Sequence, residues 1–305
     1  MTILNFNGKG KLYILTFYLL PFAVFAQKKD DLFKRLKAIH NNGVTYYNTD
    51  GINFTSQTFT NAFTEKDLKY VYRKYAIGNE DAKVKDNTLP YNNYSVVKSI
   101  KITDSLSETS SYYFIEDKQK MVTVICFSYF ENPGKQFEHS FIDLIVEDKI
   151  PMNVFEDKRI DSIDFAGRKI QLSNSCYWTN VNTVQCPYYG EMNWSVHQTR
   201  ESATKAIQNQ LALTKTRKGL KLISEEEVDV IFEHTPAKAR KVVYGFTGLT
   251  NLAVKTSGGK TLTAYYVACE VRNNYVSCVM SFWNNDQINE SGLPPLLEKV
   301  MQLPK

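Results

Sequence analysis

"SYYFIEDKQKMVTVICFSYFEN", residues 111–132, and "AYYVACEVRNNYVSCVMSFWNN", residues 264–285, are the two stretches that decide the fold. They align without a gap at an offset of 153 residues, so that Tyr112 meets Tyr265 and Ser128 meets Ser281. Each stretch has two runs of aromatic and β-branched residues around a polar centre, which is the pattern of two antiparallel strands joined by a turn. The sequence therefore predicts one antiparallel hairpin in each half of the chain.

The segments that follow the two hairpins also match. A polar loop precedes apolar residues at helical spacing, first over residues 135–148 and then around Leu296 to Met301. A tandem duplication would explain both matches, and the alternative is a chance match between two tyrosine-rich hairpins. We therefore predict an α+β protein of two similar domains, residues 27–150 and 151–305, each an antiparallel β-sheet covered by amphipathic helices.

The beginning of the first domain has its own pattern. Residues 28–43 place four apolar side chains at helical spacing before Asn42-Gly43, which predicts a helix with a C-terminal stop. Asp50-Gly51 then predicts a turn between two strands. Thr64 predicts the N-cap of a second helix, and residues 95–129 are expected to be extended.

The first 26 residues have the layout of a secretory signal peptide. Lys9 and Lys11 precede an apolar run that ends at Ala26, and the run is too short to span a membrane comfortably. Cleavage before Gln27 would release the mature chain. We therefore expect an exported protein, periplasmic or extracellular, with no transmembrane anchor after cleavage.

The charge of the mature chain excludes one class of partner. Without Lys9 and Lys11, 35 basic side chains stand against 32 acidic ones. Nucleic acid binding requires a concentrated basic face, and this excess is too small to indicate one. The four histidines are not at metal-ligand spacing, and no complete phosphate-binding loop is present, so no metal, cofactor or catalytic residue is predicted.

Cysteines of exported proteins usually pair. A hairpin with an odd loop centred near Val181 would bring Cys176 opposite Cys186. The competing interpretation makes Cys176 a thiol-protease nucleophile, because "SCYW" is similar to the "GSCW" of papain-like enzymes. Tyr177 interrupts that motif and no helix-forming run follows it, so the disulfide is the better prediction.

A second disulfide is predicted in the Ala264–Asn285 hairpin. A two-residue turn at Asn273-Asn274 would place Cys269 opposite Cys278 at a non-hydrogen-bonded pair, where the α-carbons are close enough for a bridge. Cys126 is then left over in an apolar run, and we expect it to be a buried, unreactive thiol.

One cluster of aromatic and amide side chains is the candidate binding surface. It surrounds the Cys176–Cys186 hairpin and comprises Trp178, Asn180, Asn182, Tyr188, Tyr189 and Trp194. Amphipathic aromatic residues beside amides suit a protein interface or a sugar-stacking platform, although they could equally fill the core of a sheet. We predict non-catalytic binding of another envelope or secreted protein. The alternatives are an envelope hydrolase acting on glycan or peptide, with its site between the domains, and a glycan-binding module.

Overall fold

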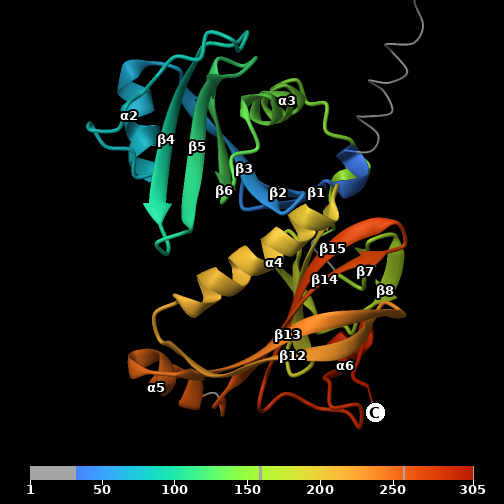
Figure 1. Cartoon of the computed structure of the whole chain (residues 1–305). Helices are drawn as coiled ribbons and strands as arrows, with labels where there is room; N and C mark the ends of the chain where they lie inside the picture. The colour runs from blue at the N-terminus through green and yellow to red at the C-terminus, as the bar shows by residue number, and fades with distance from the viewer. Residues whose placement is uncertain (1–31, 158–159, 257, 305) are drawn as a thin grey trace, which may run out of the picture.

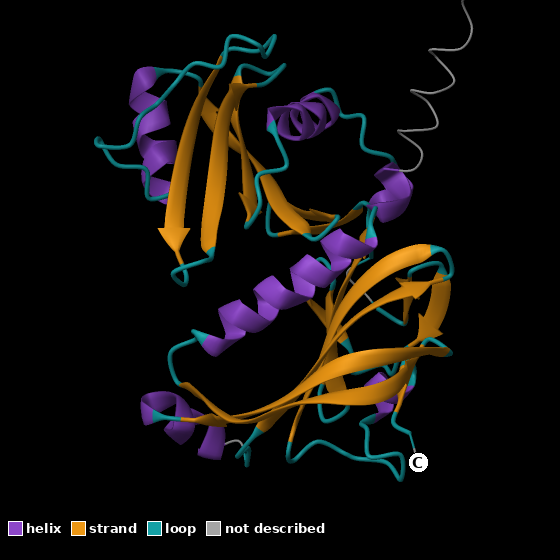
Figure 2. Cartoon of the chain, viewed as in Figure 1, coloured by secondary structure: helices purple, strands orange, loops and turns teal. Residues whose placement is uncertain are grey.

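The computed structural model describes residues 32–157, 160–256 and 258–304. Antiparallel strands dominate the fold, with 46% of the described residues in strands and 21% in helices. Figure 2 shows two large sheets, one in each half of the chain, with few helices against them. The α+β prediction with antiparallel sheets is therefore confirmed, whereas the extensive helical cover that it included is not.

The first sheet has the strand order β1-β2-β3-β6-β5-β4. Asp50 and Gly51 both have positive φ and form the predicted turn between its second and third strands. The bounds of its strands are β1 Lys37–Asn41, β2 Val44–Thr49, β3 Ile52–Ala62, β4 Asn93–Lys101, β5 Ser107–Glu116 and β6 Met121–Tyr129.

Two helices cover opposite faces of the first sheet (Figure 1). α2 spans Glu65–Lys74, and the side chain of Thr64 accepts a hydrogen bond from the backbone of Asp67, as the N-cap prediction requires. It packs on the face that carries Phe114. α3 spans Lys135–Val146 and packs on the opposite face. Both faces of the sheet are therefore apolar.

The second sheet has the order β16-β12-β13-β14-β15-β11-β10-β9. A separate small hairpin, β7 Ser162–Phe165 and β8 Arg168–Gln171, packs beside it, and the 3-10 helix η1 spans Met152–Val154. The bounds of the strands in the large sheet are β9 Tyr177–Asn180, β10 Thr183–Cys186, β11 Gly190–His197, β12 Leu220–Phe232, β13 Thr235–Phe246, β14 Leu262–Val271, β15 Asn274–Trp283 and β16 Met301–Gln302.

The helices of the second half are unequal. α4, Arg200–Lys215, packs on one face of the second sheet through Ala203 and Ile207. It runs along the side of that sheet nearer to the first half (Figure 1). α6, Pro295–Glu298, lies on the opposite face and is only one turn long, and α5 spans Gly248–Thr256. The predicted amphipathic helix after the second hairpin is therefore reduced to a single turn.

A buried ion cluster fixes the β7–β8 hairpin to the second sheet. The carboxylate of Glu233, between β12 and β13, accepts hydrogen bonds from the guanidinium groups of Arg168 and Arg272. Arg272 also donates to the backbone carbonyl groups of Phe165 and Ala166. Since the Glu233 side chain is almost fully buried, loss of either arginine would leave a poorly compensated charge.

The two halves repeat one connectivity. The first half runs β1, β2, β3, α2, β4, β5, β6, α3, and the second runs β9, β10, β11, α4, β13, β14, β15, α6 with β12, α5 and β16 added. The sheet order β1-β2-β3-β6-β5-β4 reappears as β9-β10-β11-β15-β14-β13. This agreement supports the tandem duplication, which itself stays a prediction.

The gapless alignment of the two hairpins is wrong by one residue. Tyr112 of β5 pairs with Cys126 of β6. The residue of β15 that corresponds to Cys126 is Val279, and Val279 pairs with Tyr266 rather than with Tyr265. Tyr112 and Tyr266 also both pack under the helix that follows the third strand of their half. The turn of the second hairpin is one residue shorter, and this difference displaces every match on its first strand.

The predicted Cys269–Cys278 disulfide is also wrong. The turn lies at Arg272-Asn273, where both residues have positive φ, and not at Asn273-Asn274. Cys269 therefore pairs with Val276, and Cys278 pairs with Val267. The two cysteines are diagonal neighbours on one face, and both are free thiols, as is Cys126.

The helix predicted over residues 28–43 is wrong for most of its described part, residues 32–43. Residues 32–35 form one helical turn, after which β1 begins at Lys37. Asn42 and Gly43 have positive φ and connect β1 to β2 as a hairpin turn. The segment forms a strand rather than a helix because β1 pairs with β2 along its full length. The predicted signal peptide, residues 1–26, lies outside the described residues.

Candidate functional site

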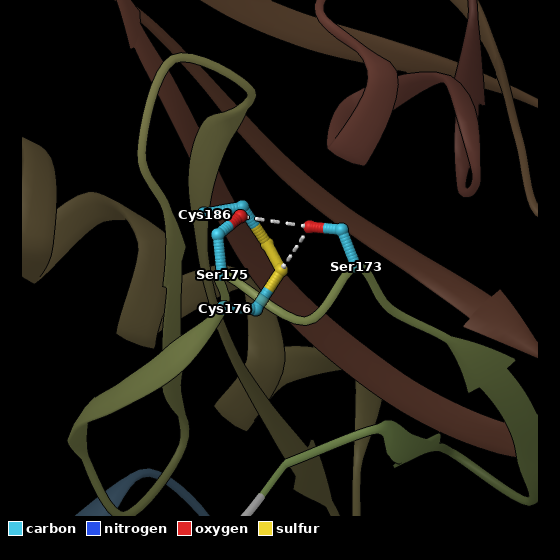
Figure 3. Close-up of a disulfide and its surroundings, with 4 residues drawn as sticks. All are labelled: Ser173, Ser175, Cys176 and Cys186. Carbon is cyan, nitrogen blue, oxygen red and sulfur yellow. Dashed lines mark hydrogen bonds between the residues drawn. A yellow bond between two sulfur atoms is a disulfide. The ribbon is translucent and has the colours of Figure 1, made fainter.

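The Cys176–Cys186 disulfide is present as predicted and closes the β9–β10 hairpin. Tyr177 pairs with Gln185 and Trp178 with Val184, so the next residues outward are the two cysteines. Figure 3 shows the hydroxyl group of Ser173 beside the sulfur of Cys176, at 3.2 Å. Cys176 is therefore a structural residue, and the papain-like interpretation has no support.

The aromatic and amide residues predicted as one binding surface are divided among the core of the second sheet, an exposed hairpin end and two pockets. Trp194 is buried in the core of the second sheet, with Trp178 packed 5.9 Å from it between ring centroids. Tyr189 packs partly buried against the same core, and Asn180 is exposed at the hairpin end. Asn182 and Trp194 line one pocket, whereas Tyr188 lines another.

The pocket that Tyr188 lines is called the hairpin pocket. It has a volume of about 390 Å³ and is formed by the loop after β10, the ends of β11 and β15 and the segment after α4. This volume is within the range of small-ligand sites. Its lining residues are Gln185, Cys186, Pro187, Tyr188, Gly190, Glu191, Arg217, Leu262, Ser281, Trp283, Asn285 and Asp286.

A tight loop presents Tyr188 to solvent. Tyr188 has a φ of 65° and is 67% exposed, and its carbonyl group accepts a hydrogen bond from Gln287. Gly190 also has positive φ, and a Cβ atom there would lie 2.7 Å from the side chain of Leu297. The loop therefore requires glycine at position 190, and the disulfide at Cys186 fixes its other end.

Two carboxyl groups share the hairpin pocket with one guanidinium group. Burial raises the pKa of Glu191, and the charge of Arg217 partly opposes that shift. Burial also raises the pKa of Asp286, against a hydrogen bond that its carboxylate accepts from the backbone of Trp283. Partly buried carboxylates in a concave site are available to bind a cation or to exchange a proton.

Sequence reasoning missed Glu191, Arg217 and Asp286. They come from β11, the segment after α4 and the segment after β15, and no short motif links them. The sequence could have indicated this site only through strand positions: Glu191 lies at the start of β11 and Asp286 follows β15, and these two strands pair.

A second pocket, called the junction pocket, lies where the two halves meet. It has a volume of about 300 Å³. Residues 33–37 of the first half form one wall, and η1, the β7–β8 turn, Asn182, β11 and Asn274 form the remainder. A cavity therefore lies at this junction, whereas the site predicted between the domains stays a prediction.

Within the described ranges, no group of three or more histidine, cysteine, aspartate or glutamate residues could hold a metal ion. Among the same residues, no helix has the length and hydropathy needed to cross a bilayer. These findings apply to residues 32–157, 160–256 and 258–304 alone.

Comparison with known proteins does not assign a family. No protein-family model and no curated protein matches the chain. Among solved structures, the di-domain ARO/CYC StfQ of the steffimycin biosynthetic pathway is 9% identical with a TM-score of 0.17, over 92% of this chain and 84% of its own. An acyl-CoA hydrolase from Agrobacterium tumefaciens is 8% identical with a TM-score of 0.16, over 86% and 85%. These values are too low to carry an argument about fold or function.

Proposed function

We propose that this chain is an exported, non-catalytic binding protein, and that it holds a segment of another envelope or secreted protein in the hairpin pocket. Export agrees with the Cys176–Cys186 disulfide, because such bonds persist in oxidising compartments. The two-domain architecture, with a boundary near Pro151, belongs to the same proposal.

The observation that carries the proposal is the side chain of Tyr188. It is a large aromatic group, held outward by a loop that the disulfide and Gly190 constrain. A rigid exposed tyrosine loses little entropy on binding, and tyrosine is enriched among the residues that dominate protein interfaces.

The chemistry of the pocket selects a basic anchor on the partner. A lysine or arginine side chain could lie along Trp283 and Tyr188 and place its charge beside Glu191. Binding of that charge would favour the ionised form of Glu191, which burial disfavours in the free protein. Affinity should therefore fall at low pH.

The test is a capture experiment with the tagged mature protein from native envelope extract, followed by quantitative mass spectrometry under non-reducing conditions. The wild-type chain should retain one partner reproducibly. Tyr188→Ala and Glu191→Gln should each reduce its recovery by about tenfold, as expected for loss of an interface anchor. Tyr70→Ala is the control, because Tyr70 is an exposed tyrosine of α2 outside the pocket lining. Equal recovery of the partner with all variants would exclude the hairpin pocket as the binding site.

Glycoside hydrolysis is a second candidate function, favoured by one observation. Glu191 and Asp286 line the same pocket, and burial raises the pKa of each, which suits the general acid that such a pair of carboxyl groups requires. Hydrolysis of envelope glycan by the purified chain, lost in Glu191→Gln and Asp286→Asn, would replace the binding proposal. No release of reducing ends would exclude this candidate.

A further inference from the structure

One end of the second sheet presents lysines together with exposed aliphatic side chains. At this end β12 begins and β13 ends, and α5 lies beyond them, at the side of the second half opposite the β7–β8 hairpin (Figure 1). The backbone of Thr247 donates to the carbonyl group of Gly219 at 2.9 Å, so the start of α5 is held against the start of β12. This surface is called the α5 tip, and its residues are Lys218, Lys221, Leu222, Ile223, Leu249 and Lys260.

The two chain segments that form the tip contain no acidic residue. Neither residues 202–224 nor residues 234–269 include an aspartate or a glutamate. Lys218, Lys221 and Lys260 are exposed, and among the described residues none of the three forms an ion pair. Because the mature chain as a whole has only a small basic excess, this concentration of positive charge is local to the tip.

Acidic residues close to this end of the sheet are compensated within the protein. Glu225, which follows the tip on β12, pairs with Lys215 at 2.6 Å. Glu191 and Asp286 line the hairpin pocket, and Arg217 supplies a positive charge beside Glu191. The lysines of the tip are therefore left to attract an anionic surface from outside the protein.

Aliphatic side chains stand among these lysines. Leu249, in the first turn of α5, is 87% exposed, and Leu222 and Ile223 are 45% and 57% exposed. Leu222 and Ile223 are consecutive residues at the point where the pairing of β12 with β13 shifts register. Aliphatic groups beside lysines match the boundary between the headgroups and the acyl chains of a bilayer, because lysine stems can lie along apolar surface while their ammonium groups reach phosphate.

We propose that the α5 tip binds the surface of an anionic phospholipid bilayer. Leu249, Leu222 and Ile223 enter the headgroup region, and the three lysines contact lipid phosphate groups. A nucleic acid would also attract the lysines, but its phosphate backbone offers no apolar region for the aliphatic side chains. The tip shares no residue with the lining of the hairpin pocket, so the inference goes beyond the proposed partner and does not depend on it.

Co-sedimentation with vesicles tests the proposal on the mature chain, residues 27–305. Vesicles of phosphatidylglycerol and phosphatidylcholine in equal parts should bind the chain about tenfold more tightly than pure phosphatidylcholine vesicles. Binding should fall in about 1 M sodium chloride, where the screening length is about 3 Å. Lys218→Gln/Lys221→Gln should weaken binding about 25-fold, because each lysine near such a surface contributes about fivefold.

The aliphatic contribution is tested separately. Leu249→Gln removes the most exposed of these side chains and should weaken binding about fivefold. The matched control for charge is Lys66→Gln/Lys69→Gln, which makes the same change at exposed positions of α2. Met152→Gln is the control for apolar surface, because Met152 is 81% exposed outside the tip. Both controls should bind as the wild-type chain does.

The proposal is overturned if neutral and anionic vesicles bind the chain equally well, or if the α2 variant loses as much binding as the tip variant. Salt-dependent binding that Leu249→Gln leaves unchanged would also overturn it, and would indicate a site for soluble polyanions instead. All substituted side chains are exposed, so the variants should fold, and urea unfolding of each variant checks this.

Discussion

At the scale of single residues, His197 gives the clearest dependence on pH. Its ring bonds Ser202 of α4 through Nδ1 at 3.0 Å and Ser277 of β15 through Nε2 at 2.8 Å. Burial lowers its pKa to about 4, with a hydrogen bond to the Asp50 backbone opposing that shift and the charge of Arg35 adding to it. The folded protein therefore holds His197 neutral at pH values where the unfolded chain binds a proton.

The sign of the effect follows from linkage. The contribution of His197 to the free energy of unfolding is fully present above pH 6.5 and is lost as the pH falls through about 4. The expected loss across that window is about 3 kcal/mol, at 1.36 kcal/mol for each unit of pKa difference. Urea unfolding at a series of pH values measures it.

Two variants distinguish the contribution of His197 to the pH dependence of stability from that of the carboxyl groups, which also titrate at low pH. His197→Gln, which is neutral throughout, should be less stable at pH 7 and should lose less stability between pH 6.5 and 4. His40→Gln, which changes an exposed histidine, should leave the pH dependence as it is. An unchanged slope in His197→Gln would contradict this account.

At the scale of elements, the β9–β10 hairpin depends on its disulfide. Cys176 and Cys186 close a short loop, and the model for the entropy of the unfolded chain predicts about 2–3 kcal/mol for such a loop. The double variant Cys176→Ser/Cys186→Ser should lose that amount, measured by urea unfolding in the absence of reductant. The double variant should also bind any ligand of the hairpin pocket more weakly, because Cys186 fixes one end of the Tyr188 loop. Full stability in the double variant would mean that the hairpin holds without the bond.

The thiols give a separate prediction about the β14–β15 hairpin. Cys126, Cys269 and Cys278 are free, so denatured, unreduced protein should titrate three thiols out of five cysteines. Burial raises the pKa of Cys278 well above its ordinary value, and it also raises the pKa of Cys269. In the folded protein the partly exposed Cys269 should react first. A count of one thiol would mean that Cys269 and Cys278, or another pair of these cysteines, form a second disulfide.

The two hairpins explain why part of the fold could be predicted and part could not. Thr64 and Asp50-Gly51 act locally, and the structure places both as their sequences indicate. The turn at Arg272-Asn273 differs by one residue from the alternative Asn273-Asn274, and this choice decides whether Cys269 meets Cys278. Local sequence permits both turns, whereas pairing along the complete strands selects one.

The candidate sites were less predictable for the same reason. The aromatic and amide side chains near the disulfide point in different directions along their strands and loops. One cluster in sequence is therefore divided among the core, an exposed hairpin end and two separate pockets. Glu191 and Asp286 have no pattern of their own. Their proximity depends on the pairing of β11 with β15, which joins segments distant in the chain.

At the scale of the whole molecule, the repeated connectivity leaves a polar junction between the halves. The hydroxyl group of Ser195 in the second half donates to Asn48 in the first, and the backbone of Gln198 donates to Asp50 at 2.8 Å. Gly51, with positive φ, approaches His197 so closely that a Cβ atom would lie 2.8 Å from the ring. One buried hydrogen bond, one exposed hydrogen bond and the close contact of Gly51 with the His197 ring thus set how the halves meet.

A double-mutant cycle tests whether that junction couples the halves. Asn48→Ala and Ser195→Ala each break the bond and leave a buried partner, so each should destabilise the protein by about 1–3 kcal/mol. The double variant should lose less than the sum, with a coupling energy of about 1 kcal/mol, since both changes remove one interaction. Thr58→Ala is the matched control, because it removes a bond to Thr123 within the first sheet that shares no partner with Asn48 or Ser195. It should be additive with Ser195→Ala. Additivity in both cycles, measured by urea unfolding, would mean that Ser195 and Asn48 are neighbours without energetic coupling and that the halves are held together elsewhere.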